Sequence, residues 1–219
     1  MFKPASAGGL GACNKQSEVK TMRAFSRCGA IALGAMFVVT GNAGADFLGL
    51  SVERHATVST PQGTKAVWRV YAYFSDGADQ VVSWGGMQAL PAVIESRECS
   101  EQLGGDFFNP GGVTAPSQAI IDAFPAFEWD TFVTIGVSVA DQGSGPGGTD
   151  MTQVAGMTGF ITDNQYVSET ATVFIAGTGP GTEQARADYA GDGDPSLRVL
   201  LMQLTTPEED GVRVRRHCS

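Results

Sequence analysis

The sequence predicts an all-β fold: a single β-sandwich or jelly-roll-like domain with one short helix, preceded by a signal peptide. Residues 129–140 alternate, with β-branched residues such as Val133 and Val137 at every second position, which indicates a strand with one buried face. Residues 66–74 alternate in the same way, and the apolar run at 197–206 is typical of a strand in the middle of a sheet. Turn residues separate about seven to nine such stretches, a pattern typical of a β-sandwich.

The first half of the domain is expected to contain strands at residues 47–54, 66–74, 80–84 and 92–95. Pro61 and Gly63 predict a turn at 59–64. The sequence Ser-Asp-Gly-Ala at 75–78 predicts a hairpin that leads into the strand at 80–84. Trp68 shares a face of its strand with Val70 and Phe74, so we expect it to pack in the core.

The centre of the chain predicts one anchored loop and the single helix. In the loop at 107–112, two phenylalanines are expected to hold the backbone against the core. Thr114 is the expected N-cap of a helix at 115–123, which Pro125 ends. Three residues of this helix are expected to face inward: Ala119, Ile120 and Ala123.

The remaining strands are expected at 154–162, 170–176, 197–206 and 211–216. Arginines at 213, 215 and 216 would protect the last strand as an edge strand. The glycine-rich stretch at 141–150 predicts a flexible, exposed loop by composition. It lacks the Gly-Lys-Ser/Thr of a phosphate-binding loop, so we do not expect it to bind nucleotides.

The N-terminal residues have the pattern of a secretory signal peptide at 22–45. A basic segment with Lys20, Arg23 and Arg27 precedes the apolar run at 28–40, and small residues at 43–45 predict cleavage after Ala45. Residues 1–21 are interpreted as an upstream extension or a disordered leader. Cleavage leaves one domain at 46–219, with no membrane span, and predicts a secreted or periplasmic location.

The mature domain is strongly acidic. Cleavage removes five of the 14 basic residues and one of the 23 acidic residues, which leaves a net charge of −13. Such a surface repels phosphate backbones and anionic lipids, so nucleic-acid and membrane partners are not expected. The mature chain keeps two cysteines, Cys99 and Cys218, and in an oxidising compartment these are expected to form a disulfide, with two free thiols as the alternative.

Three segments together resemble a family of uncharacterised, secreted bacterial β-rich modules. They are the strand patterns at 68–74 (WRVYAYF), 129–136 (WDTFVTIG) and 198–206 (RVLLMQLTT). The resemblance implies export and a single β-domain, and it implies no activity, substrate or catalytic residue.

Few residues in the mature chain predict chemistry. His55 and His217 have no metal-ligand spacing around them and no Gly-x-Ser-x-Gly motif. Glu128 and Asp130 flank Trp129, and on an extended strand they would project to the same side and could act as the acid and base of a glycosidase. The simpler interpretation is two solvated charges at the start of a strand.

Two binding sites are further possibilities. Asp188, Asp192 and Asp194 lie in a glycine-containing loop that could bind Ca²⁺, or could be an ordinary acidic loop. Core packing is the default interpretation for Trp84 and Trp129, and the alternative is that both are exposed and stack on sugar rings.

We therefore expect a secreted, non-catalytic module with a structural, adhesive or binding role, whose ligand could be a carbohydrate or another cell-surface component. The alternatives are an extracellular hydrolase that acts on polysaccharide through acidic residues, and a calcium-dependent carbohydrate-binding module.

Overall fold

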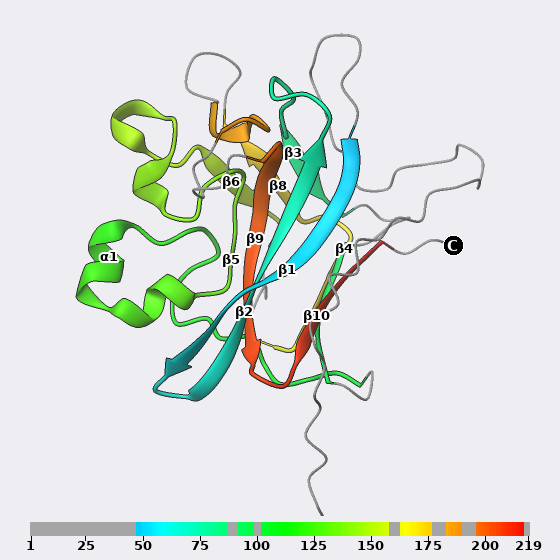
Figure 1. The fold of residues 1–219 in the computed structure, drawn as a ribbon, viewed down its shortest axis with the longest axis vertical. Helices are drawn as coiled ribbons and strands as arrows, with labels where there is room; N and C mark the ends of the chain where they lie inside the picture. The colour runs from blue at the N-terminus through cyan, green and yellow to red at the C-terminus, as the bar shows by residue number, and fades with distance from the viewer. Residues whose placement is uncertain are drawn as a thin grey trace, which may run out of the picture.

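The computed structural model describes residues 47–86, 92–98, 102–157, 163–176, 183–189 and 196–216. Within them the protein is mostly β, with antiparallel sheets and one short α-helix, α1 (Gln118–Ala123), as Figure 1 shows. Four short 3₁₀ helices accompany it, η1 (Pro125–Trp129), η2 (Ala140–Gln142), η3 (Pro146–Gly148) and η4 (Glu183–Ala185). The strands are β1 (Phe47–Thr60), β2 (Gly63–Phe74), β3 (Ser83–Gly85), β4 (Ala92–Arg97), β5 (Phe132–Val133), β6 (Thr152–Ala155), β7 (Gln165–Ser168), β8 (Thr172–Ile175), β9 (Arg198–Pro207) and β10 (Gly211–Arg216).

The strands form three antiparallel sheets. The largest has the order β1-β2-β9-β5, and the two smaller ones have the orders β10-β4-β7 and β3-β8-β6. No helix within the described part of the chain is long and apolar enough to cross a bilayer. The predicted signal peptide at 22–45 lies outside the described residues.

One hydrophobic core joins the three sheets. β2 and β9 contribute Val70, Phe74, Leu201 and Leu204, and residues of the smaller sheets pack against them. Trp68 is partly buried against this core, as predicted, and its indole N–H donates a hydrogen bond to Thr206 Oγ1 (3.2 Å). The contributions of the smaller sheets include Trp84, Ile94, Tyr166, Val173 and Ile175.

The prediction for β9 is confirmed. It lies between β2 and β5, and its residues from Val199 to Thr206 are all buried. Because both of its edges are paired and both of its faces are covered, its sequence is mostly apolar. Among its polar residues, Gln203 is only 1% exposed and forms specific contacts described below.

The expected hairpin at 75–78 is wrong. Asp76 Oδ1 accepts the Ala78 amide (2.8 Å), so the turn forms, but β3 then pairs with β8 and not with β2. The hairpin between β1 and β2 forms where Pro61 predicted a turn, with Thr60 opposite Gly63. Turn residues predict where the chain reverses, whereas the core decides which strand it joins.

The stretch at 131–139 is not a strand with one buried face. Only Phe132–Val133 is a strand, and all residues from 131 to 137 are buried. The backbone still follows β9, because the amides of Thr134 and Gly136 donate to Leu201 O and Leu200 O. At Gly136 the φ angle is 88°, and a Cβ would lie 1.6 Å from Gln184 O, so the chain turns away from β9 where glycine allows it.

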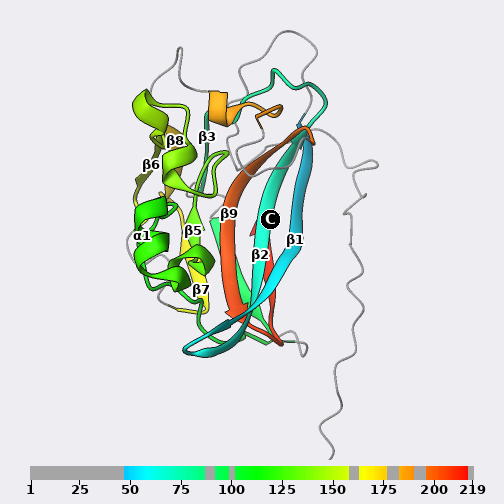
Figure 2. The same cartoon turned by 60° about the vertical axis from the view of Figure 1, so that its left-hand side comes forward.

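The helix also differs from its prediction. α1 begins after Ser117, whose side chain accepts the Ile120 amide (3.4 Å), and Thr114 is not the cap. Ala119, Ile120 and Ala123 are exposed, not inward-facing. Figures 1 and 2 show the reason: α1 lies beyond β5, at the edge of the large sheet farthest from β1, where little packs over it.

The glycine-rich stretch at 141–150 is more ordered than its composition predicts. It contains η3, and Gly143 and Gly145 are buried. The carboxamide of Gln184 accepts the amides of Ser144 and Met151 (both 3.1 Å). Its nitrogen donates to Ile135 O (3.0 Å) and Asp150 Oδ1 (2.7 Å), so one side chain holds this stretch against the neighbouring segments.

Candidate functional site

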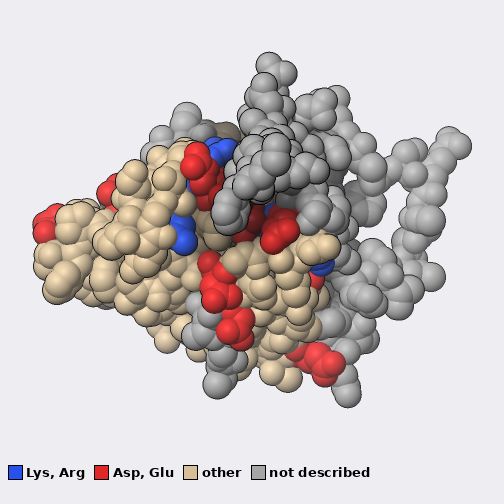
Figure 3. All heavy atoms as spheres, turned by 90° about the horizontal axis from the view of Figure 1, so that it is seen from below, with Lys and Arg blue, Asp and Glu red and all other residues tan. Residues whose placement is uncertain are grey.

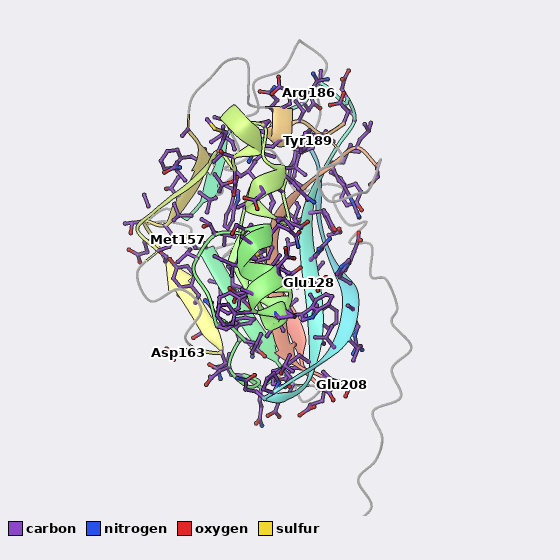
Figure 4. The ribbon with its side chains drawn as sticks, turned by 90° about the vertical axis from the view of Figure 1, so that its left-hand side faces the viewer. Glu128, Met157, Asp163, Arg186, Tyr189 and Glu208 are labelled. Carbon is purple, nitrogen blue, oxygen red and sulfur yellow. The ribbon has the colours of Figure 1, made fainter. Side chains whose placement is uncertain are left out.

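The two carboxylates singled out in the sequence lie in different environments. Glu128 is exposed in η1, whereas Asp130 ends η1 as its C-cap and is only 1% exposed. The interpretation of both as solvated charges is therefore wrong for Asp130. They also do not share the face of an extended strand, because Glu128 lies in a helical turn. Figure 4 views the molecule from the side on which α1, η1 and Glu128 lie.

Asp130 lies at a junction of three parts of the chain. Its amide donates to Phe127 O within η1 (3.1 Å), and its backbone carbonyl accepts a hydrogen bond from Gln203 Nε2 on β9 (3.0 Å). Its side chain lies against the loop at 107–112, because a Cβ on Gly111 would be 2.1 Å from Asp130 Oδ2. The absence of a side chain at Gly111 lets the loop approach this closely.

The two carboxylate oxygens of Asp130 are unequally satisfied. Oδ1 accepts the Thr131 amide (2.8 Å), but Oδ2 has no hydrogen-bond partner among the described residues. The Gly111 amide lies close to Oδ2, yet it donates to Asn109 Oδ1 (3.1 Å). Burial raises the pKa of Asp130 to about 7, although the backbone amides of Thr131 and Gly111 act in the opposite direction.

Gln203 fastens this segment to the large sheet. Its Nε2 donates to the carbonyls of Glu128 and Asp130 (both 3.0 Å), and its Oε1 accepts from Arg69 Nε on β2 (3.2 Å). No sequence motif predicted a role for this residue. The available signal was a single amide inside the apolar run of β9, because a buried amide in a strand needs hydrogen-bond partners.

The two candidate stacking tryptophans are also in different places. Trp84 is buried, at 7% exposure, and donates its indole N–H to Thr134 O (3.3 Å), so it packs in the core, as the default interpretation has it, and is not placed to stack on a ligand. Trp129 is partly exposed at the end of η1.

The segment at 118–129 carries four apolar residues that are exposed or partly exposed, and we call them the aromatic surface: Ile120, Phe124, Phe127 and Trp129. Phe124 is 62% exposed and Ile120 is 42% exposed. The rings of Phe124 and Phe127 lie 5.8 Å apart between centroids and are tilted by 43°. Neither α1 nor η1 contains a buried residue, so this surface projects from the body of the protein.

The proposed calcium loop is only partly described. Asp188 binds Arg186 through both carboxylate oxygens, at 2.9 and 2.6 Å, and both side chains are partly exposed. Asp192 and Asp194 lie outside the described residues. Among the residues that are described, no group of three or more His, Cys, Asp or Glu side chains is placed to hold a metal ion.

A second polar cluster, not identified in the sequence, lies on β1, β2 and β9. Arg198 donates to Glu53 Oε2 (2.9 Å) and Tyr73 Oη (3.0 Å), and its guanidinium lies 3.6 Å from the ring centre of Tyr71. Burial acts to raise the pKa of Glu53, but hydrogen bonds from Tyr73, Ser51 and Arg198 outweigh it and lower that pKa. The carboxylate therefore stays ionised and joins the three strands.

The remaining candidate residues lie either on the surface of the protein or outside the described residues. His55 is exposed on β1. His217, Cys99 and Cys218 lie outside the described residues, so the disulfide stays a prediction. No family model, curated protein or solved structure matches the chain. The resemblance to secreted β-rich modules thus depends on the three strand patterns alone.

Proposed function

We propose that the chain is an exported, non-catalytic β-sandwich or jelly-roll-like domain that binds a carbohydrate of a cell surface or matrix through its aromatic surface. The observation that carries this proposal is the exposure of Phe124 and Ile120, with the ring of Phe127 beside that of Phe124, on a segment that also contains the partly exposed Trp129. Grouped exposed apolar side chains are uncommon on soluble proteins without a binding role.

The chemistry of the segment suits a sugar ring. Aromatic faces pack against the apolar C–H face of a pyranose, while hydroxyl groups need acceptors at the edge of the ring. Two acceptors lie in the same segment: Glu128 is exposed, and Asp122 is exposed and accepts Gln118 Nε2 (2.9 Å). A neutral polyol can approach these carboxylates, whereas an anionic ligand would be repelled.

Two further observations support the rest of the proposal. The large sheet and the two smaller sheets share one core, which suits a two-layered arrangement. Acidic side chains are spread over the face seen in Figure 3, with few basic ones among them, which suits a protein that avoids nucleic acid and anionic lipid.

The binding proposal is tested with the mature chain on a glycan array, followed by calorimetry of the glycans retained. We expect F124A and W129A to lose at least tenfold in affinity. V167A is the matched control, because Val167 is 52% exposed on β7 and lies outside the aromatic surface. Equal binding by F124A and V167A would contradict the proposal, and repeating the assay with a chelator tests calcium dependence.

The export proposal has a separate test. Expression of the full chain in a bacterial host should give a periplasmic or secreted product whose N-terminal residue is Asp46. A cytoplasmic product that retains residues 22–45 would contradict it.

A hydrolase is the second candidate, and the raised pKa of Asp130, about 7, favours it, because a general acid must be protonated near neutral pH. Asp130 would have to become accessible to a substrate, and exposed Glu128 would supply the second carboxylate. Release of reducing sugar from a polysaccharide panel, lost in both D130N and E128Q, would establish this activity. Release unchanged in both variants would exclude these residues as its catalysts.

A further inference from the structure

We propose that Asp130 is a pH-responsive contact: as the neutral acid it holds η1 and the loop at 107–112 against β9, and its ionisation loosens both. The proposal depends on the position of the side chain. Asp130 is 1% exposed, and its Oδ2 faces the backbone of Gly111 without a hydrogen-bond partner among the described residues.

A charge at this position would be poorly stabilised. The Thr131 amide donates to Oδ1 at 2.8 Å, while the Gly111 amide, which lowers the pKa of the carboxyl group in part, donates its hydrogen bond to Asn109 Oδ1, and burial outweighs both amides. A buried carboxylate usually needs two or three donors, or a cationic partner, to remain charged. The neutral acid avoids this cost, and we therefore expect it to be the form that packs.

The groups around Asp130 do not supply a compensating charge. From η1 comes Glu128, which is exposed and of the same sign, and from β9 comes the neutral amide of Gln203. Arg69 on β2 donates to Gln203 Oε1, so this amide separates its guanidinium from the aspartate. The loop at 107–112 and β5 contain no ionisable side chain.

The direction of the effect follows from the raised pKa. A carboxyl group whose pKa is about 7 when packed and close to its ordinary value when open favours the packed form fully below about pH 4. The preference for the packed form decreases as the pH rises from about 4 to about 7, and above about pH 7 it is constant. Between pH 6 and pH 8 these two pKa values give about a tenfold increase in the open fraction.

The consequence for binding rests on the proposed function. Asp130 is the C-cap of η1, and η1 carries Phe127 and Trp129 of the aromatic surface. Loosening of η1 would alter the spacing of these rings, so the affinity for a sugar should be higher at mildly acidic pH than at pH 8.

Hydrogen–deuterium exchange of the mature, ligand-free chain at pH 6 and pH 8 tests the contact. After division by the intrinsic exchange rate at each pH, amides at 107–113 and 125–131 should open about tenfold more at pH 8 in the wild type. D130N, which keeps the shape but cannot ionise, should change less than twofold. D163N is the matched control and should behave like the wild type, because Asp163 is exposed just before β7 and lies outside the segments around Asp130.

The proposal would be overturned if the opening of these amides did not increase from pH 6 to pH 8 in the wild type, or if it increased equally in D130N. If D130N does not fold, carbon-13 NMR of the wild-type carboxyl groups decides: a titration near pH 7 supports the contact, and one near pH 4 overturns it. Because no ligand is present, these results do not depend on whether the aromatic surface binds sugar.

Discussion

Two buried aspartates, Asp130 and Asp210, show how partners decide what a buried carboxylate does. Both are almost fully buried, at 1% and 3% exposure, and both lie against a glycine-containing loop. Asp210 Oδ2 accepts the Gly105 amide (2.7 Å) and Ser96 Oγ (3.2 Å). Asp130 Oδ2 accepts no hydrogen bond in the described part of the chain.

The difference has opposite consequences for the two junctions. At Asp210 the carboxylate stabilises the turn between β9 and β10, because removing it would leave the Gly105 amide without its partner. At Asp130 the charge itself opposes packing. Burial alone therefore does not show whether an acidic residue stabilises a fold.

The largest expected effect comes from removing the ability of Asp130 to ionise. Because its pKa is raised to about 7, the wild type should lose about 2–3 kcal/mol of unfolding free energy relative to D130N between pH 5 and pH 8. Urea denaturation at several pH values measures this difference. If the difference in unfolding free energy between the wild type and D130N stayed constant from pH 5 to pH 8, the contrast drawn between Asp130 and Asp210 would be wrong.

D210N should lower the unfolding free energy at neutral pH, which is opposite in sign to the effect expected of D130N. The amide keeps the shape of the side chain but replaces a charge-assisted acceptor, and if its nitrogen faces the Gly105 amide it leaves two donors in contact. We expect a loss of about 1–2 kcal/mol, measured by the same denaturation at pH 7. A D210N variant as stable as the wild type would show that the two junctions do not differ as described.

G111A tests the close approach of the loop to Asp130. A Cβ would lie 2.1 Å from Asp130 Oδ2 and 3.1 Å from the ring of Phe127, so the loop must shift. We expect a loss of about 1 kcal/mol in unfolding free energy, from thermal denaturation, and faster exchange of the Thr131 amide. G112A is the control, because nothing lies within 4 Å of its Cβ position.

The smallest effect on stability is expected for F124A. The ring is 62% exposed, so its removal should change the unfolding free energy by less than about 0.5 kcal/mol while lowering the affinity for sugar at least tenfold. A loss of stability of about 2 kcal/mol or more would mean that the ring supports the fold and would remove the main argument for a binding surface.

The regular features of the fold could be predicted from periodicity. The run at 197–206 is mostly apolar because both faces of β9 are buried, and Phe107 and Phe108 are buried beneath the loop that they were expected to anchor. The burial of residues 131–137 on both sides could not be predicted. Their alternation indicated one buried face, but Gln184 and β9 cover both sides.

The site was harder to predict, because its properties arise from residues distant in sequence. Nothing beside Asp130 indicates burial: Glu128 and Trp129 precede it, and the residues that enclose it include Gly111 and Gln203. The exposure of Ile120 was missed for a related reason. Helical spacing indicated a buried face, but α1 lies outside the edge of the large sheet and none of its residues is buried.

Gln184 has a consequence for how the protein would age and be degraded. Its one carboxamide accepts from Ser144 and Met151 and donates to Ile135 and Asp150, so it ties together segments that would otherwise be easy targets for proteases. Deamidation would replace the donor with a negative charge facing the Asp150 carboxylate. A change of one functional group would then release the glycine-rich stretch and expose it to cleavage.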